Sequence, residues 1–331
     1  ILWRVVLSNG LIPDDVPLTV INSVTPAYSS LSNVINDVTP PLYTLLGSTY
    51  DLVTLNLNIE LTCYNIVDTT AGITIVSNWI TDQVRNINIY SPINTKTQCN
   101  VIQKFSGGYG SGYQLWGGLT TSAAYTKIDG LQVISDSLNG IYCLNAPNST
   151  VVNCLIKTIN SDAIVFENGV TSTTSTTTST TTSTTSTPVV VNPEINIIIN
   201  NLIYDCTGKG ISIIDRHGNI DDIYYCFNNN TIGCDKGLSF TADVNAWRNI
   251  VIVKNHISQF NTIDYELVNK NSGQLLITNS VSSDNTANGF INKINFINTS
   301  LKFTDYINKD FHLDIADIIL LGYGIDLTYN S

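Results

Sequence analysis

The sequence predicts an all-β fold, a parallel β-helix built from coils of about 24 residues. Short runs rich in Ile, Val, Tyr and Thr recur along the chain, such as IELTCYNI, INIIINNLIY and NIVIVKN, and they are typical of strands. In addition, an Asn or Asp followed two positions later by an aliphatic residue recurs at positions 129, 153, 200, 230, 255 and 279. A unit this short cannot bury its own apolar face, whereas stacked units can.

A second signal follows each recurring Asn or Asp by about 7 to 11 residues, as a small or turn residue and then a strand. The six examples are GIYCL at Gly140, DAIVF at Asp162, GISII at Gly210, GLSF at Gly237, DYELV at Asp264 and GFI at Gly289. Because the two signals keep their order in six consecutive units, we interpret each unit as one coil. Asn tolerates left-handed φ and bonds backbone groups, so we expect it at a turn of each coil, stacked into a ladder with a repeat of about 4.8 Å.

One segment has helical spacing. In SSLSNVINDV, the apolar residues Leu31, Val34, Ile35 and Val38 follow the i, i+3, i+4, i+7 pattern. Ser29 or Ser30 can cap the start of this helix, and the Pro pair at 40–41 ends it. The sequence therefore predicts one short helix before a long run of strands.

An uninterrupted Ser/Thr run, TSTTSTTTSTTTSTTST, occupies positions 171–187. It separates the recurring Asn residues at 153 and 200, which are 47 residues apart, and removing roughly 171–193 leaves about one ordinary coil. We therefore expect a disordered loop inserted at 171–193 into one continuous solenoid, and not a linker between two domains. The expected organisation is an N-terminal segment at 1–44 and a β-helix at 45–331.

Composition excludes several classes of function. Only 12% of the residues are charged and the formal net charge is -11. Binding to nucleic acid needs clustered Lys and Arg, so no nucleic-acid partner is expected. No apolar run approaches the roughly 20 residues that span a bilayer, so no membrane span is expected either. The chain begins at Ile1, which indicates a processed or truncated product.

The cysteine pattern does not indicate a metal site. There are seven cysteines, no CxxC pair and no Cys/His cluster at the spacing of metal ligands. We expect most of them to be small apolar core residues, with one or two disulfides open as an alternative for an extracellular protein. The three histidines are dispersed, so no metal and no cofactor are expected.

Four segments resemble a known group of proteins. They read VSNWITDQVRNINIYSP, YQLW, KIDGLQV and KDFHLDIADIILLGYGIDL. They are similar to single-stranded right-handed parallel β-helix proteins of the pectate-lyase-like superfamily, in particular to examples from bacteriophages and uncultured bacteria. The resemblance covers roughly residue 45 to the C-terminus. It implies that the helix near Leu31 to Val38 caps the open end of the solenoid, and that a terminal coil lies near Phe311 to Leu327.

The best catalytic candidates are three acids at the ends of successive strands. AIVFE, ISIID and LSFTAD end at Glu167, Asp215 and Asp243, and Arg216 and His217 follow the middle acid. In register, neighbouring acids would lie about 4.8 Å apart and the outer pair about 10 Å apart. Glycoside cleavage needs two carboxylates at a fixed separation, so the row could cleave a polysaccharide.

The alternative interpretation is that these acids only form turns. A register error of one residue moves a side chain to the other face of its sheet. The polygalacturonase-type branch of the superfamily is expected to carry a double-Asp strand, a Gly-His-Gly turn and an Arg-Ile-Lys. Here DRHGNIDD has a different order, and no Arg-Ile-Lys follows it.

A glycine-rich segment, GGYGSGYQLWGG at 107–118, carries three aromatic residues. Tyr109, Tyr113 and Trp116 could stack on sugar rings. The other interpretation is an exposed turn that leads into the strand near Trp116.

Three functions follow from these observations. The favoured one is a non-catalytic structural or adhesive protein of a virion or an extracellular surface, such as a phage fibre, spike or decoration protein. The second is a polysaccharide lyase or glycoside hydrolase that acts along the solenoid groove. The third is a carbohydrate-binding module. Expected partners are a surface polysaccharide or structural proteins of a particle or cell surface, together with further copies of the chain in a trimer or array.

Overall fold

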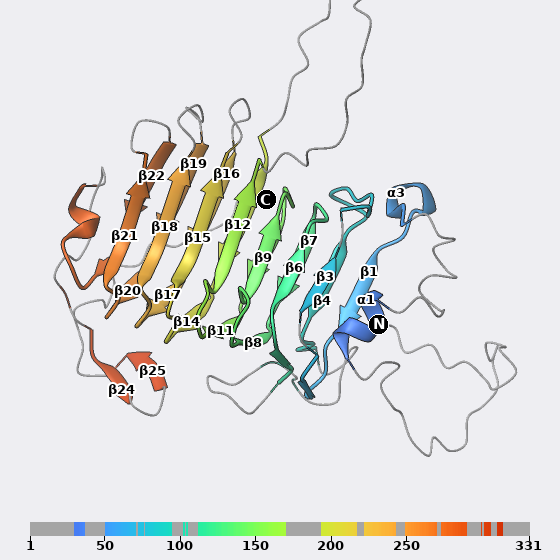
Figure 1. Cartoon of the computed structure of the whole chain (residues 1–331), viewed down its shortest axis with the longest axis horizontal. Helices are drawn as coiled ribbons and strands as arrows, with labels where there is room; N and C mark the ends of the chain where they lie inside the picture. Colours follow the sequence, from blue (N-terminus) through green and yellow to red (C-terminus); the bar gives the residue numbers. More distant parts are fainter. Residues whose placement is uncertain are drawn as a thin grey trace, which may run out of the picture.

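The protein forms three parallel sheets that wind around one apolar core (Figure 1). The computed structural model describes residues 30–36, 50–70, 72–75, 77–94, 102, 104, 112–169, 193–216, 222–242, 249–269, 273–289, 299, 301–305 and 310–313. Within these residues the chain passes from sheet 1 to sheet 2 to sheet 3 and then returns to sheet 1, one coil further along. The predicted parallel β-helix is therefore confirmed.

Each complete coil contributes one strand to each sheet, and from β1 to β23 the neighbouring strands of a sheet are three elements apart and parallel. Sheet 1 contains β1 (Ile59–Thr62), β4 (Ile87–Tyr90), β7 (Thr126–Asp129), β10 (Thr150–Val152), β13 (Ile195–Ile199), β16 (Ile223–Phe227), β19 (Asn249–Lys254) and β22 (Gly273–Thr278). Sheet 2 contains β2 (Val67–Asp68), β5 (Gln114–Trp116), β8 (Gln132–Ser135), β11 (Leu155–Thr158), β14 (Leu202–Tyr204), β17 (Asn230–Ile232), β20 (Ile257–Gln259) and β23 (Val281–Ser282). Sheet 3 contains β3 (Ile73–Ile75), β6 (Leu119–Thr121), β9 (Ile141–Leu144), β12 (Ile164–Asn168), β15 (Lys209–Asp215), β18 (Lys236–Ala242) and β21 (Ile263–Val268).

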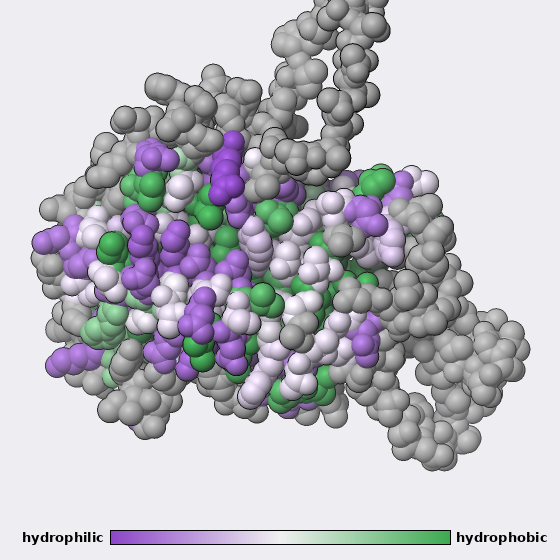
Figure 2. All heavy atoms as spheres, viewed as in Figure 1, coloured by the Kyte–Doolittle hydropathy of each residue, from purple (hydrophilic) through white to green (hydrophobic). Residues whose placement is uncertain are grey.

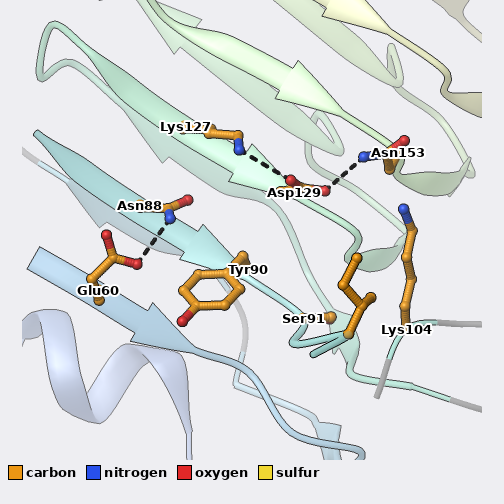
Figure 3. A pocket seen from close by; sticks show the side chains of 9 residues that line it. Glu60, Asn88, Tyr90, Ser91, Lys104, Lys127, Asp129 and Asn153 are labelled. Atoms are coloured by element: carbon orange, nitrogen blue, oxygen red, sulfur yellow. Dashed lines mark hydrogen bonds and ion pairs between the residues drawn. The ribbon is translucent and has the colours of Figure 1, made fainter. Parts of the chain in front are cut away.

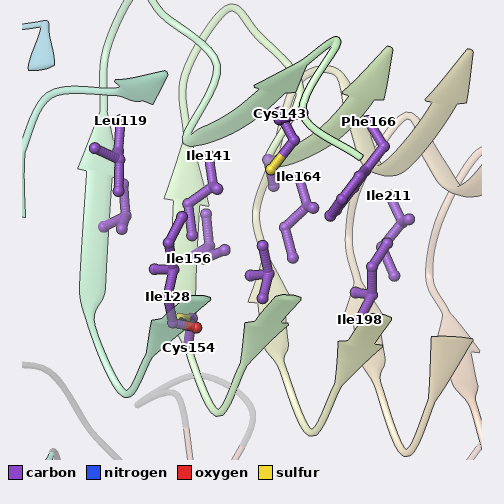
Figure 4. Packing of buried hydrophobic residues seen from close by; sticks show 14 of the residues in the cluster. Leu119, Ile128, Ile141, Cys143, Cys154, Ile156, Ile164, Phe166, Ile198 and Ile211 are labelled. Carbon is purple, nitrogen blue, oxygen red and sulfur yellow. Dashed lines mark hydrogen bonds between the residues drawn. The ribbon is translucent and has the colours of Figure 1, made fainter. Parts of the chain in front are cut away.

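Aliphatic side chains stack along the inside of the solenoid. Ile141, Ile164, Ile211 and Leu238 occupy the same position in four successive coils of sheet 3, and all are fully buried. Figure 4 shows the first three of them. Burial of one such side chain contributes about 1.5–3 kcal/mol to the free energy of unfolding. Because each coil presents the same row to the next, the core extends along the axis with the number of coils.

The coils keep their register across the Ser/Thr run. Val152 of β10 pairs with Ile199 of β13, and in the same way β11 pairs with β14 and β12 with β15. All three sheets therefore continue from one side of the run to the other. The predicted disordered loop itself falls on residues that lie outside the described part of the chain, except for Pro193.

The predicted helix is present as α1 (Leu31–Asn36). The Ser30 hydroxyl oxygen accepts a hydrogen bond from the Asn33 amide at 3.1 Å, which caps the start of the helix. Leu31 is buried in the core, and Val34 and Ile35 pack against it. A second helix, α3 (Leu52–Leu55), was not predicted because four residues are too few for a helical pattern. The short 3-10 helix η1 covers Thr286–Gly289.

The recurring Asn residues take left-handed φ at the turn between sheets 1 and 2, as predicted. The φ angles are 57° at Asn153 and Asn200, 54° at Asn228, 53° at Asn255 and 52° at Asn279. The prediction that Asn230 is a turn residue is wrong, because Asn230 begins β17 and Asn228 makes the turn. In the coil before Asn153, the turn residue is Gly130, with a φ of 75°, and not its predicted neighbour Asp129.

The residue after each turn Asn points inward and forms a second, buried ladder. The Cys154 amide donates to Asn201 Oδ1 at 2.9 Å, and the Asn201 amide donates to Asn229 Oδ1 at 3.0 Å. Asn229 Nδ2 in turn donates to the Ile198 carbonyl at 2.8 Å. Asn201 and Asn229 are fully buried, so these bonds satisfy polar groups that water cannot reach.

The C-terminal region differs from the prediction of a further coil near Phe311 to Leu327. β24 (Phe303–Asp305) and β25 (Asp310–Leu313) pair with each other in antiparallel orientation. On the outer face of sheet 2, the ring centres of Phe311 and Tyr204 lie 4.9 Å apart, and Phe303 packs into the same cluster. The predicted coil is therefore wrong for residues 311–313, and 314–327 lie outside the described residues.

Six cysteines lie in the described part of the chain, and all are buried and free: Cys63, Cys143, Cys154, Cys206, Cys226 and Cys234. Their role as small core residues is as predicted, and disulfides between these six are absent. Cys99 lies outside the described residues.

The buried ladder leads to a stability prediction. Replacement of Asn229 by Ala removes the acceptor of the Asn201 amide, so we expect the free energy of unfolding to fall by about 2–3 kcal/mol. Replacement of its neighbour Asn230, a partly exposed residue on the outer face of β17, should change it by at most about 0.5 kcal/mol. Urea unfolding of both variants measures the difference, and equal losses would contradict the ladder.

A second prediction concerns His256, which occupies the ladder position one coil after Asn229. Burial lowers the pKa of His256 to about 3, so the folded protein keeps it neutral where the unfolded chain protonates it. The unfolded state therefore binds more protons below pH about 6.5, and the stability contributed by His256 falls by about 1.4 kcal/mol per pH unit as pH drops toward 4. His256→Asn places the residue of the two preceding coils there and should remove this slope. Denaturant unfolding at several pH values gives both slopes, and identical slopes would exclude a neutral buried His256.

Candidate functional site

The predicted row of acids is not in register. Glu167 pairs with Ile214 of the next coil, whereas Asp215 pairs with Asn168 and with Ala242. Adjacent residues of a strand point to opposite faces, so Glu167 faces outward and Asp215 faces the interior, where it is fully buried. The predicted common row is therefore wrong for these two residues. Asp243 and His217 lie outside the described residues.

Glu167 is held in a surface ion pair. The Tyr142 hydroxyl donates to Glu167 Oε2 at 2.5 Å, and Arg216 Nη2 lies 2.9 Å from Oε1. Burial raises the pKa of the Tyr142 hydroxyl, and the hydrogen bond to Glu167 raises it further. Both carboxylate oxygens are thus engaged by neighbouring side chains.

Asp215 belongs to a buried polar cluster at the turn from sheet 3 to sheet 1. The Tyr224 hydroxyl donates to Asp215 Oδ2 at 3.0 Å, and Asn168 Nδ2 donates to the Tyr224 hydroxyl at 3.0 Å and to Asp222 Oδ2 at 3.3 Å. Burial, followed by the charges of Asp215 and Asp222, raises the pKa of Tyr224 well above its ordinary value. Cleavage by two acids requires both to reach one sugar, and Glu167 and Asp215 lie on opposite faces of their sheet.

The structure also separates the predicted aromatic residues. Tyr113 is buried, and its hydroxyl donates to Asp68 Oδ2 at 2.5 Å, so its ring cannot stack on a sugar. Trp116 is 50% exposed and borders an open hollow of about 560 Å³ with Ile134, Leu138 and Ile159. Tyr109 lies outside the described residues.

A polar hollow of about 250 Å³ lies on the outer face of sheet 1, near the N-terminal end of the solenoid (Figure 3). Its side chains come from β1, β4 and β7, from the segment between β4 and β5, and from the turn after β10. They are Glu60, Asn88, Tyr90, Ser91, Ile93, Lys104, Lys127, Asp129 and Asn153. We call this site the polar hollow.

The register of the coils brings these residues together. Glu60, Asn88 and Lys127 occupy one outward row on three successive strands, and Tyr90 and Asp129 lie two residues further along theirs. Sequence reasoning missed the row because its members are 28 and 39 residues apart, so no constant period connects them. Only the pairing of the strands reveals it.

Hydrogen bonds and one ion pair fix the carboxylates of the hollow. Asn88 Nδ2 donates to Glu60 Oε2 at 2.9 Å. Lys127 Nζ lies 3.2 Å from Asp129 Oδ2, and Asn153 Nδ2 donates to Asp129 Oδ1 at 2.8 Å (Figure 3). Because Asn153 is one of the turn residues with left-handed φ, the turn ladder also positions Asp129.

Lys104 closes the hollow from a different segment, between β4 and β5. Its side chain lies over Gly130, where an added Cβ would come 3.4 Å from Lys104 Cγ. Burial lowers the pKa of Lys104, the charge of Lys127 lowers it further, and Asp129 opposes the shift. Two lysines, two carboxylates, two amides and a phenol thus meet in one hollow, which provides both donors and acceptors for a ligand with many hydroxyl groups.

No metal site is found in the part of the chain that the structure describes, where no group of three or more His, Cys, Asp or Glu is placed to hold an ion. Among the same residues, no helix is long and apolar enough to cross a membrane. Comparison with protein-family models, with curated proteins and with solved structures finds no match to this chain.

The opposite orientations of Glu167 and Asp215 lead to a testable difference. Asp215→Ala removes the acceptor of a buried hydroxyl, and we expect a loss of about 1–3 kcal/mol in the free energy of unfolding. Glu167→Ala removes a surface ion pair and should cost about 0–1 kcal/mol. Chemical unfolding of both variants compares them, and a larger loss for Glu167→Ala would contradict the observed register.

Proposed function

We propose that the protein is a non-catalytic structural or adhesive β-helix of a virion or an extracellular surface, and that it binds a surface polysaccharide in the polar hollow. The observation that carries this proposal is the convergence of lysine, amide, phenol and carboxylate groups from successive coils on an open outer face. We also propose that it is related to the pectate-lyase-like superfamily, and the three-sheet coil supports that relation.

The chemistry of the hollow fits a sugar better than an apolar ligand. A saccharide presents hydroxyl groups that both donate and accept hydrogen bonds, and the amides of Asn88 and Asn153 can do the same. At about 250 Å³ the hollow is smaller than a typical site for a drug-sized molecule, so it suits one or two sugar units of a longer chain. Lys104 and Lys127 favour a sugar that carries a carboxylate, such as a uronic acid.

The scaffold supports a structural role. Stacked aliphatic rows and two turn ladders repeat along the axis, which produces a stiff body with an extended outer surface. The low content of charged residues, with Asn, Ser, Thr and Tyr in their place, supports an extracellular or virion location.

The arrangement of the carboxylates supports binding without cleavage. Glu60 accepts from Asn88, and Asp129 is engaged by both Lys127 and Asn153. A glycosidase needs one carboxyl group free to protonate the leaving oxygen and a second on the other side of the bond. Both carboxylates of the hollow instead accept from neighbouring side chains.

One observation favours a polysaccharide lyase as the second candidate. Lys104 and Tyr90 line the same hollow, and burial lowers the pKa of Lys104, which favours the neutral amine that can act as a base. In β-elimination the base takes the C5 proton of a uronate, the C4–O4 bond breaks, a C4–C5 double bond forms, and O4 leaves with a proton. Tyr90 is the nearby hydroxyl that could supply that proton.

Binding of polygalacturonate oligomers, measured by isothermal titration calorimetry against neutral dextran oligomers, tests the proposal. We expect polygalacturonate to bind more tightly than dextran, and Lys127→Gln and Lys104→Gln each to weaken that binding about tenfold through loss of a charge-assisted contact. Lys254→Gln is the matched control, since it removes the same charge from the same sheet four coils away from Lys127.

The outcomes separate the candidates. Equal weakening by Lys254→Gln, or no binding of either glycan, would contradict a glycan site in the polar hollow. Unsaturated products that accumulate with time and disappear in Lys104→Gln would replace the binding function by lyase activity.

A further inference from the structure

The outer face of sheet 1 changes character along the solenoid. On β1, β4 and β7 it carries the polar hollow, whereas on β13, β16, β19 and β22 its central row is apolar. That row contains Ile197, Tyr225, Ile252 and Leu276, which pair in register from strand to strand. All four are partly exposed, while the two neighbours of each in sequence are buried and face the core.

The rows beside the central one are also largely apolar. Ile195, Ile223 and Ile250 form one of them, and Ile195 is 37% exposed. Ile199 and Phe227 begin the other. The central row is therefore apolar on all four strands, while the rows beside it become polar at Lys254 of β19 and at Gln274 and Thr278 of β22.

Charge is nearly absent from this patch. The chain has a net charge of -11, but the outward positions of β13, β16, β19 and β22 include no acidic residue. Lys254 is their one charged residue, and its Nζ lies 5.6 Å from the centre of the Phe227 ring. A second copy could thus approach this face without repulsion between carboxylates across the contact.

The other two outer faces show how this chain treats its surface. On sheet 2, the apolar residues Tyr204 and Ile232 are covered by Phe311 of the β24–β25 hairpin. The outer face of sheet 3 mixes apolar and polar residues, and it carries an ion pair with Lys236 Nζ at 2.6 Å from Glu266 Oε1. Figure 2 shows hydrophilic residues gathered over the half of the molecule in which β15, β18 and β21 are labelled in Figure 1. The apolar rows of sheet 1 are partly exposed, unlike the Tyr204–Ile232 part of sheet 2.

We propose that the β13–β16–β19–β22 face of sheet 1 is a self-association surface, which packs against the same face of a second copy. Two identical sheets have the same twist, and such sheets pack face to face with their aliphatic side chains interdigitated about 10 Å apart. A two-fold axis through the contact makes it self-complementary and limits it to a pair. The polar hollow lies at the other end of the sheet, so the proposal is independent of glycan binding.

The size of the patch sets the strength of the contact. Four strands about 4.8 Å apart, each with an outward span of about 17 Å, give roughly 300–400 Å² of projected area per copy. A stable interface buries about 800 Å² per partner. We therefore expect weak, concentration-dependent pairing with a dissociation constant in the micromolar range or above.

Sedimentation velocity of the full chain from about 1 µM to about 500 µM tests the proposal. The sedimentation coefficient should rise with concentration toward that of a dimer. Ile252→Glu places a carboxylate at the centre of the patch and should raise the dissociation constant at least tenfold. The matched control is Ile214→Glu, which makes the same change at a partly exposed outward position of β15 on sheet 3 and should leave the dissociation constant unchanged.

The melting temperatures of both variants are measured to exclude unfolding as the cause. If Ile252→Glu does not fold, Leu276→Glu on the last strand of sheet 1 takes its place. A wild-type chain that stays monomeric at the highest concentration would overturn the proposal. So would dissociation by Ile214→Glu to the same extent, because the contact would then involve sheet 3.

Discussion

Hydrogen bonds between equivalent turn residues of neighbouring coils fix the register on which the rest of the structure depends. A parallel sheet of short strands specifies register weakly when similar aliphatic residues recur, and a slip of one residue would exchange inward and outward side chains. The buried bonds from Cys154 to Asn201 and from Asn201 to Asn229 oppose such a slip, because a shifted coil would leave buried amides without partners. The ladder also continues across the 47 residues that contain the Ser/Thr run.

The same register distributes chemistry over the outer faces. Three coils place Glu60, Asn88 and Lys127 side by side, and the turn residue Asn153 orients Asp129 beside them. Later coils put Ile, Tyr and Leu at the positions that carry polar residues in the first coils. One sheet therefore presents a polar end and an apolar end, and the two proposals, glycan binding and self-association, concern separate ends of it.

The fold was predictable because its signals lie in local sequence, whereas the sites depend on register. The recurring Asn indicated a turn with left-handed φ, and the pattern around it gave the coil and the continuity across the Ser/Thr run. The same pattern misplaced the turn at Asn230 and aligned Glu167 with Asp215, since strand ends are uncertain by one or two residues. Coils of unequal length concealed the polar hollow, and no sequence period indicated that β24 and β25 would pair with each other.

Side chains of one coil hold the backbone of the preceding coil across the insertion. Amide hydrogen exchange at Cys154 tests it most directly, because this amide donates to Asn201 Oδ1, 47 residues later. We expect Cys154 to exchange only through global unfolding, as slowly as the core amide of Ile156. Asn201→Ala should make Cys154 exchange much faster while Ile156 stays protected. Fast exchange at Cys154 in the wild-type protein, or no effect of Asn201→Ala, would show that the buried ladder does not hold these two coils together.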